Sequence, residues 1–176
     1  MAEIVKDNLK YKHHFDKKTK RHYLNGTLTV LHCHHYTTLY SQLALDAGET
    51  EIIKECARQS IRDMLATYFE NNPGDRTRET MAKLCCDYYA VLGMGKMQIL
   101  NMGATSGKVT LLMSHLDAGW KKKWGTYDKP VNYITAGFIE AMFETVFDTA
   151  PKTFEAKEVQ SIVMGAETSI FNVTRR

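Results

Sequence analysis

The sequence has no long apolar segment, and this absence limits where the protein acts. Its first 18 residues contain no apolar run that could serve as a signal peptide, and no later stretch is long enough to span a bilayer. We therefore expect a cytoplasmic protein without a membrane span. The net charge of +3 is also too small to indicate a nucleic acid or another polyanion as partner.

Linkers, internal repeats and low-complexity tracts are missing as well, so nothing divides the chain. Its 176 residues fit one domain, residues 1–176, and a hydrophobic fraction of 44% is ordinary for a globular core. The cysteines lie in helix-like or strand-like segments and not in a loop-rich disulfide framework, so we expect free thiols. They are Cys33, Cys56, Cys85 and Cys86.

Apolar residues at helical spacing predict four helices. The first runs from about residue 36 to residue 47, where Gly48 is placed to end it. Residues 51–70 and 81–92 show the amphipathic pattern of surface helices. Residues 133–147 are apolar on nearly every side, which predicts a largely buried helix.

Short runs of β-branched and apolar residues predict the strands. Residues 27–33 form one candidate, residues 97–102 and 108–113 flank a turn-rich loop as in a hairpin, and residues 153–163 and 169–174 form a last pair. Because strands and helices occur in separate blocks, the pattern favours an α+β fold. We predict an antiparallel sheet of about five strands packed with about four helices.

The C-terminal segment carries the most specific pattern in the chain. Its spaced residues are Glu158, Ser161, Gly165, Ser169 and Phe171, preceded by Asn132 and a Thr-Ala-Gly segment that ends at Gly137. These residues resemble the 4-vinyl-reductase (hydrocarbon-binding) domain family, whose tail has a glutamate, a cysteine, a glycine, a second cysteine and a phenylalanine at this spacing. The family includes the effector-sensing domain of aromatic-catabolism regulators.

The resemblance implies the NO-signalling/Golgi-transport ligand-binding fold, which TRAPP-type transport subunits share. It also implies a homodimer that binds or senses a small hydrophobic or aromatic molecule. The regulator relatives continue into an ATPase and a DNA-binding module, for which the 176 residues here leave no room. We therefore expect the signal to pass to a separate downstream regulatory protein. The ligand-binding residues that we infer from the sensor relatives are His35, Tyr36, Tyr40, Trp120, Phe138 and Met142.

In metal-binding members of the family, the resemblance implies zinc held by the glutamate and the cysteines. The matching residues here are Asn132, Glu158, Ser161 and Ser169. Zinc needs thiolates or neutral imidazoles for tight four-coordinate binding, and serine hydroxyls are poor substitutes. We therefore predict no zinc at this position, with both serine hydroxyls hydrogen-bonded across the final turn.

His32, Cys33, His34 and His35 form the most reactive-looking cluster. If the strand continues through it, His32 and His34 point to the same face and could share a metal or a ligand carboxylate, although a metal needs a third ligand. The ordinary interpretation is that one histidine packs at the strand-to-helix junction and the others face solvent. We assign no catalytic residue and favour a binding protein over an enzyme.

Two other functions remain open. A tetrapyrrole-binding enzyme or carrier would use a histidine such as His35 as axial ligand. A structural assembly subunit of the transport-complex type would show a filled interior and a large apolar surface patch in place of a cavity.

Two further patterns allow a binding or a structural role. Methionines 94, 97, 102 and 113 offer an adaptable pocket lining, although filling the core is their commoner role. The basic segment with Trp120 and Trp124 is expected to be a loop whose indoles dock over the core, in preference to gripping nucleic acid.

Overall fold

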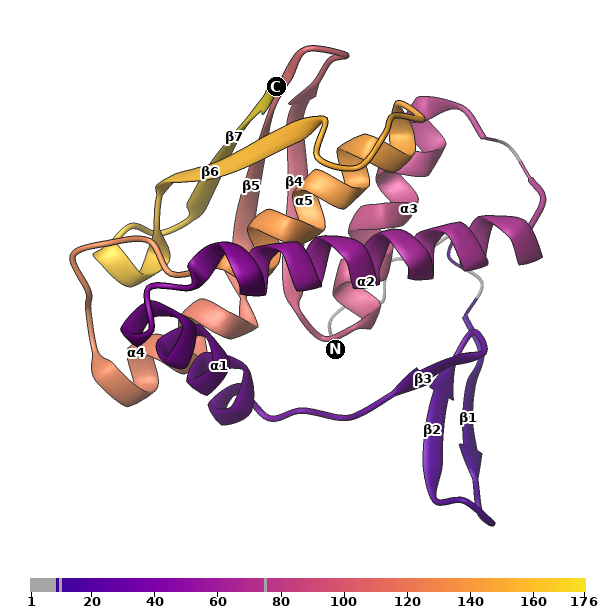
Figure 1. The fold of residues 1–176 in the computed structure, drawn as a ribbon, viewed down its shortest axis with the longest axis horizontal. Helices are drawn as coiled ribbons and strands as arrows, with labels where there is room; N and C mark the ends of the chain where they lie inside the picture. The colour runs from indigo at the N-terminus through magenta and orange to yellow at the C-terminus, as the bar shows by residue number, and fades with distance from the viewer. Residues whose placement is uncertain (1–8, 10, 75) are drawn as a thin grey trace, which may run out of the picture.

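The computed structural model describes residues 9, 11–74 and 76–176, and its α+β architecture confirms the predicted fold class (Figure 1). Within these residues the strands are β1 (His13–Asp16), β2 (Arg21–Leu24), β3 (Thr27–Thr29), β4 (Gly95–Met102), β5 (Ser106–Ser114), β6 (Phe154–Gln160) and β7 (Ser169–Arg175). The helices are α1 (His34–Asp46), α2 (Thr50–Asn71), α3 (Arg78–Val91), α4 (His115–Trp124) and α5 (Tyr133–Val146), with a 3-10 turn, η1 (Ile162–Met164).

The strands form two antiparallel sheets instead of the single sheet of about five strands that we predicted. One has the order β1-β2-β3 and the other the order β4-β5-β7-β6. The predicted strand 27–33 ends at Thr29 and belongs to the smaller sheet, because α1 begins at His34 with Cys33 as its N-cap. The polar hairpin of β1 and β2 has no clear apolar alternation, and the sequence pattern missed it.

Helix α4 replaces the loop that we predicted around the two tryptophans. Ser114 caps its N-terminus by accepting a hydrogen bond from the backbone N–H of Asp117 at 3.1 Å. Leu116 and Trp120, one turn apart, form its buried stripe. Three consecutive lysines in the last turn hide this periodicity in the sequence, but they suit the negative end of the helix dipole.

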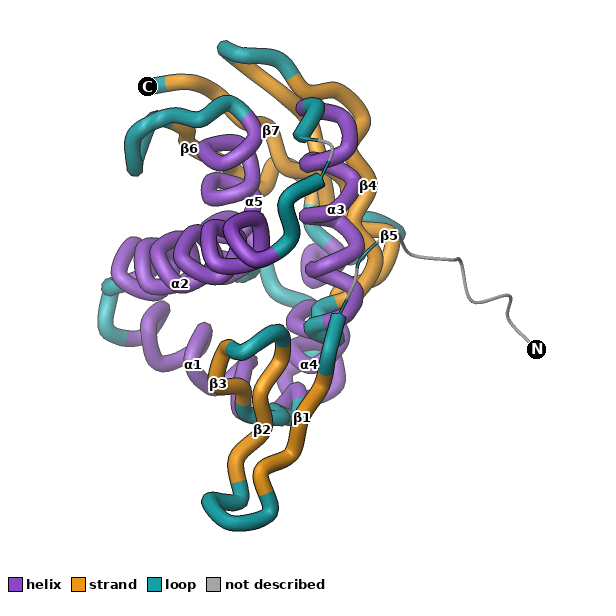
Figure 2. Tube along the Cα trace, turned by 90° about the vertical axis from the view of Figure 1, so that its right-hand side faces the viewer, coloured by secondary structure: helices purple, strands orange, loops and turns teal. Residues whose placement is uncertain are grey.

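Helix α5 lies between α2 and the four-stranded sheet, and it is buried as predicted (Figure 2). Gly137 allows the close contact with α2, since a Cβ atom there would lie 2.2 Å from the backbone oxygen of Lys54. On the sheet side, the Phe143 ring fills the space above Gly107 of β5. The core therefore sits on both sides of this helix.

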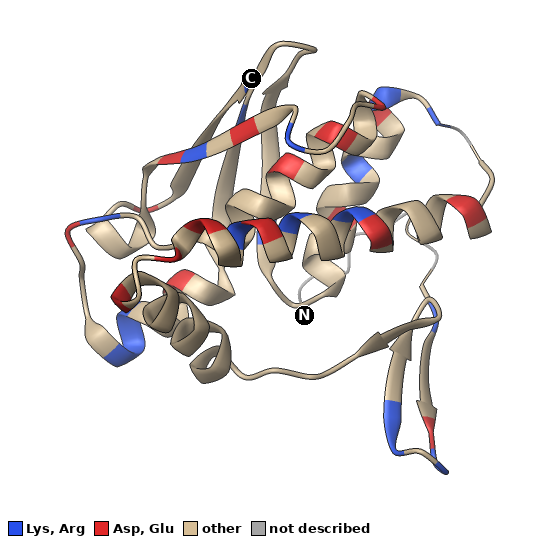
Figure 3. Ribbon diagram, viewed as in Figure 1, with Lys and Arg blue, Asp and Glu red and all other residues tan. Residues whose placement is uncertain are grey.

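Charged residues lie on both α2 and α5 (Figure 3), and several of them pair across the contact between the two helices. The buried Glu144 carboxylate accepts hydrogen bonds from Arg58 and Arg62, both at 3.0 Å. Lys54 lies 3.7 Å from Glu140 one turn earlier on α5. These pairs fix the register of the two helices because breaking one would leave a buried charge without its partner.

The small sheet projects from the body as an arm (Figures 1 and 2). Its base is anchored by the buried Leu24 and by a 3.3 Å hydrogen bond from the Asn25 amide to the Tyr88 hydroxyl. The segment that leads from the arm to α1 exposes Val30 and Leu31, at 68% and 74% of their surface. None of the described helices is long and apolar enough to cross a membrane.

Candidate functional site

Three of the six residues predicted to contact a ligand lie on the surface of α1. His35, Tyr36 and Tyr40 are exposed. The two tyrosine rings pack edge-on against His32, with ring centroids 5.9 and 6.1 Å from the histidine ring. They form an aromatic group on the outside of the helix.

The other three predicted residues are fully buried. Trp120 packs with Val131 and Val163 in a small cluster. Phe138 and Met142 belong to the main core, where the Phe138 ring lies 5.0 Å from that of Tyr89. The structure thus places the six residues in separate regions, and their contact with a ligand stays a prediction.

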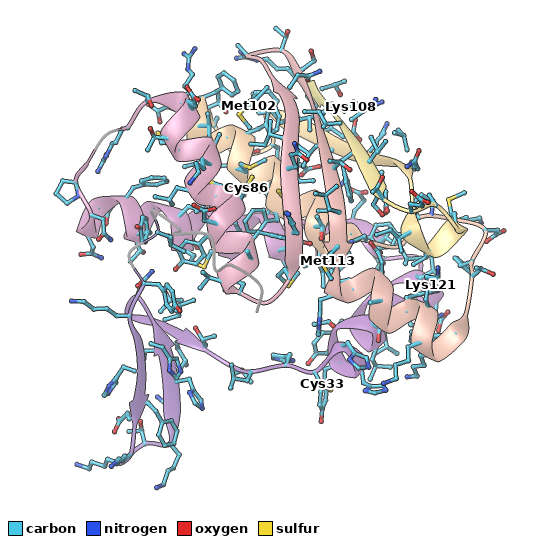
Figure 4. The ribbon with its side chains drawn as sticks, turned by 180° about the vertical axis from the view of Figure 1, so that it is seen from behind. Cys33, Cys86, Met102, Lys108, Met113 and Lys121 are labelled. Carbon is cyan, nitrogen blue, oxygen red and sulfur yellow. The ribbon has the colours of Figure 1, made fainter. Side chains whose placement is uncertain are left out.

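A groove of about 630 Å³ lies between α3 and the edge strand β4. This volume falls in the range of small-molecule sites, roughly 300–1,000 Å³. Its apolar walls are Ala82, Cys86, Met97, Ile99, Met102, Ala104 and Phe147. Figure 4 labels Cys86 on α3 and Met102 at the end of β4, the two elements that flank the groove. The two methionines were among those singled out in the sequence, but nothing there paired β4 with α3.

The chemistry of the groove favours binding over reaction. Burial, with the neighbouring Asp87 charge as a smaller cause, raises the pKa of the Cys86 thiol to about 12. A thiol with this pKa stays protonated and acts as an apolar surface, because only the thiolate is nucleophilic. Charged side chains lie at the rim of the groove, and the Lys83 ammonium lies 3.6 Å from the Asp87 carboxylate.

A polar cluster apart from the groove contains the residues at whose positions the family resemblance implies zinc ligands. The Asn132 side-chain amide donates to Asp117 Oδ2 and to Ser114 Oγ, both at 3.1 Å. The Ser169 hydroxyl donates to the same Asp117 oxygen at 3.3 Å, and the Asn132 backbone N–H donates to Glu158 Oε2 at 3.4 Å. Asp117 therefore joins the predicted residues from a helix that the sequence pattern missed.

Both serine hydroxyls are hydrogen-bonded in the final turn, but only that of Ser169 bonds across it as predicted. Ser169 accepts a hydrogen bond from the backbone N–H of Ile162 at 3.0 Å, and Ser161 accepts one from Val163 at 3.3 Å. Gly165 completes this turn with a φ of 100°, a conformation that glycine adopts without strain.

The donor set of this cluster does not fit zinc. It offers carboxylates and hydroxyls but no thiolate or imidazole, and the Asn132 amide directs its N–H groups at Asp117. Among the described residues, no group of three or more His, Cys, Asp or Glu side chains is placed to hold a metal ion.

The carboxyl groups of this cluster have raised pKa values, which favours binding of a proton in place of a metal ion. Burial, together with the charge of Asp117, raises the pKa of Glu158 to about 7. Burial also raises the pKa of Asp117, although hydrogen bonds from Ser114, Asn132 and Ser169 oppose this rise. Asp117 Oδ1 and Glu158 Oε1 have no hydrogen-bond partner in the described part of the chain. The cluster thus favours the protonated form of a carboxyl group near neutral pH.

The histidine cluster does not have the predicted geometry. Because no strand runs through it, His32 and His34 do not share a strand face. The His34 ring lies 4.3 Å from that of His35 and 5.8 Å from that of His115 on α4. Partial desolvation and these neighbours lower the pKa of His34, which favours a neutral ring packed at the helix start.

Neither a protein-family model nor a curated protein matches this sequence. Solved structures do match it. The phenol-responsive sensory domain of the transcription activator PoxR, solved with phenol, aligns with 93% of this chain and 84% of its own, at a TM-score of 0.74 and 11% identity.

Two further structures share the fold. A trafficking protein particle complex subunit 3 from Naegleria fowleri, covalently bound to palmitic acid, covers 80% of this chain and 90% of its own, with a TM-score of 0.55 and 12% identity. A vinyl-4-reductase family protein from Methanocaldococcus jannaschii covers 84% of each chain, with a TM-score of 0.53 and 15% identity. The predicted relationships are thereby confirmed at the level of the fold.

Proposed function

We propose that this protein binds a small hydrophobic or aromatic molecule non-covalently in the groove between α3 and β4. The observation that carries the proposal is the apolar lining of this groove, with its volume of about 630 Å³. The shared fold supports it, since the PoxR sensory domain is phenol-responsive and the Naegleria subunit holds palmitic acid.

The walls of the groove suit ligands of varied shape. Met97 and Met102 carry flexible thioethers that adapt to different outlines. Each methylene group that a ligand buries in the groove stabilises the complex by about 0.8 kcal/mol. The loss of translational and rotational freedom on association opposes binding by at least about 4 kcal/mol. Phe138 and Met142, two of the residues predicted from the family resemblance, are buried in the core and do not line the groove, so their contact with a ligand stays a prediction.

Methionine-methyl NMR tests the site directly. Titration with phenol should shift the methyl signals of Met97 and Met102, which line the groove. Met113, which is 67% exposed on β5 and absent from the groove lining, is the internal control and should not move. Unchanged signals of Met97 and Met102 at millimolar phenol and with longer alcohols such as octanol would refute the proposed site.

We also propose a homodimer, because the chain carries two separate apolar surfaces. Tyr36, Leu39, Tyr40 and Leu43 form an exposed stripe at helical spacing along α1. The arm and its connection expose Leu28, Val30 and Leu31. A two-fold axis would let the arm of one copy cover the α1 stripe of the other, which gives a self-complementary contact.

Sedimentation velocity tests the dimer. Leu43→Glu should convert it to a monomer, whereas Leu100→Glu, a matched change at an exposed leucine of β4, should leave it intact. A wild-type monomer at high micromolar concentration would contradict the proposal, and the stripe would then fit an assembly subunit with a different partner. Transfer of the ligand signal to a separate regulatory protein stays a prediction.

A further inference from the structure

One end of the groove carries a cation that has no carboxylate partner among the described residues. Arg78 is the first residue of α3, and its guanidinium carbon lies 5.1 Å from the centroid of the Phe147 ring. In the described part of the chain, no carboxylate lies within ion-pair distance of Arg78. The aromatic ring thus positions a guanidinium at the groove without neutralising it.

The other charged side chains described at the groove do not form an ion pair with Arg78. Lys83 and Asp87 lie 3.6 Å apart and largely offset each other. Glu79 is exposed, as Arg78 is, and it also borders a neighbouring hollow on the far flank of α3, formed with Asn72 and Arg76. Only Arg78 of the two is held by a ring of the groove, that of Phe147. The N-terminus of α3 lies at the same end as Arg78 and adds the positive end of the helix dipole.

We propose that the groove selects an organic acid: a monocarboxylate with an apolar body, bound with its carboxylate at Arg78. The inference rests on the proposed function and names the class of ligand that the same site takes. A guanidinium donates two parallel hydrogen bonds to a carboxylate, which gives both affinity and orientation. The body of the acid then lies along Ala82, Cys86, Met97 and Ile99.

Three probes of equal chain length separate charge from apolar contact. Octanoate, octanol and octylamine share an apolar body and differ in the polar end. Calorimetric titration should show octanoate binding about tenfold more tightly than octanol, as expected for one charge-assisted interaction at a partly exposed site. Octylamine should bind most weakly. Added salt should weaken the binding of octanoate and leave that of the uncharged octanol nearly unchanged.

Substitutions at Arg78 identify the residue responsible. Arg78→Gln should abolish the preference for octanoate and leave octanol binding unchanged, and Arg78→Lys should restore part of the preference. Arg21→Gln, on the exposed arm, removes the same charge outside the groove and should change neither affinity. Circular dichroism melting of each variant checks that the fold is kept.

The outcomes distinguish this inference from the proposed function. Equal binding of octanoate and octanol, tighter binding of octylamine, or an unchanged preference in Arg78→Gln would overturn the selection of acids while the groove remains a binding site. Wild-type protein in which neither octanoate nor octanol shifts the Met97 and Met102 signals would overturn both.

Discussion

Raising the pH from 5 to 8 is expected to destabilise this protein, because the folded state holds a proton that the unfolded state releases. Glu158 has a pKa of about 7 in the folded protein, above its ordinary value of 4.5. Between these two values the folded state binds more protons than the unfolded state, so the free energy of unfolding falls as pH rises. The stabilisation is complete below about pH 4.5 and is lost as pH passes through about 7.

The size of the effect follows from the two pKa values. At 1.36 kcal/mol per pH unit, a rise from 4.5 to about 7 corresponds to about 3 kcal/mol. The raised pKa of Asp117 acts in the same direction. Such a loss is a large fraction of the roughly 5–15 kcal/mol by which domains are stable.

Urea unfolding followed by circular dichroism at pH 5, 6, 7 and 8 measures this dependence. Glu158→Gln removes the titrating group, so the difference in unfolding free energy between wild type and variant should change by about 2–3 kcal/mol between pH 5 and pH 8, since part of the full effect lies below pH 5. This difference cancels the titrations of groups that do not interact with Glu158, including that of His34, whose lowered pKa gives the opposite slope. Glu167→Gln, on the exposed turn before β7, is the matched control and should follow the wild type. The reasoning fails if Glu158→Gln and wild type show parallel curves.

Three further predictions concern the core and the polar cluster. Gly137→Ala should lower the free energy of unfolding by about 1–3 kcal/mol in urea titration, because the new methyl group would meet the Lys54 carbonyl at 2.2 Å; an unchanged midpoint would contradict the close helix contact. Glu144→Ala should lower the free energy of unfolding by about 3–5 kcal/mol in the same assay, since Arg58 would lose a buried partner. A decrease below about 1 kcal/mol would contradict a structural role for this ion pair. Elemental analysis should find no stoichiometric zinc, and zinc that disappears in Glu158→Ala would disprove our interpretation of the cluster.

The sequence predicts a helix well where its apolar residues form a clear pattern. Helix α2 was correctly predicted because its apolar residues recur at helical spacing, and α5 because it is apolar on nearly every side. Helix α4 was missed because only Leu116 and Trp120 report its buried side, and the lysines after them imitate a polar loop. The arm was missed because both of its faces are largely exposed, which leaves no alternation to detect.

The candidate sites depend more strongly on contacts between distant segments. The spacing of Glu158, Ser161 and Ser169 predicted a shared turn, since these residues are close along the chain. Asp117 lies 52 residues from its partner Ser169, and no local pattern connects the two. The groove likewise needs Arg78 and Phe147 to meet, and their contact depends on how α3 packs beside α5.

The polar cluster stands where the family resemblance implies a metal site, but a proton is favoured there in place of the metal ion. The family resemblance implies zinc ligands at these positions, where a cation would balance the negative charge. Here hydroxyls and an amide stand where the resemblance implies cysteines, and the buried Asp117 adds a second carboxylate that acts on the half-buried Glu158. Burial, and the repulsion between two such carboxylates when both are ionised, favour binding of a proton in this cluster. A chelator should therefore leave the unfolding midpoint unchanged, whereas the shift from pH 5 to pH 8 should lower it; a midpoint that responds to chelator and not to pH would show that a metal ion, and not a proton, holds this cluster together.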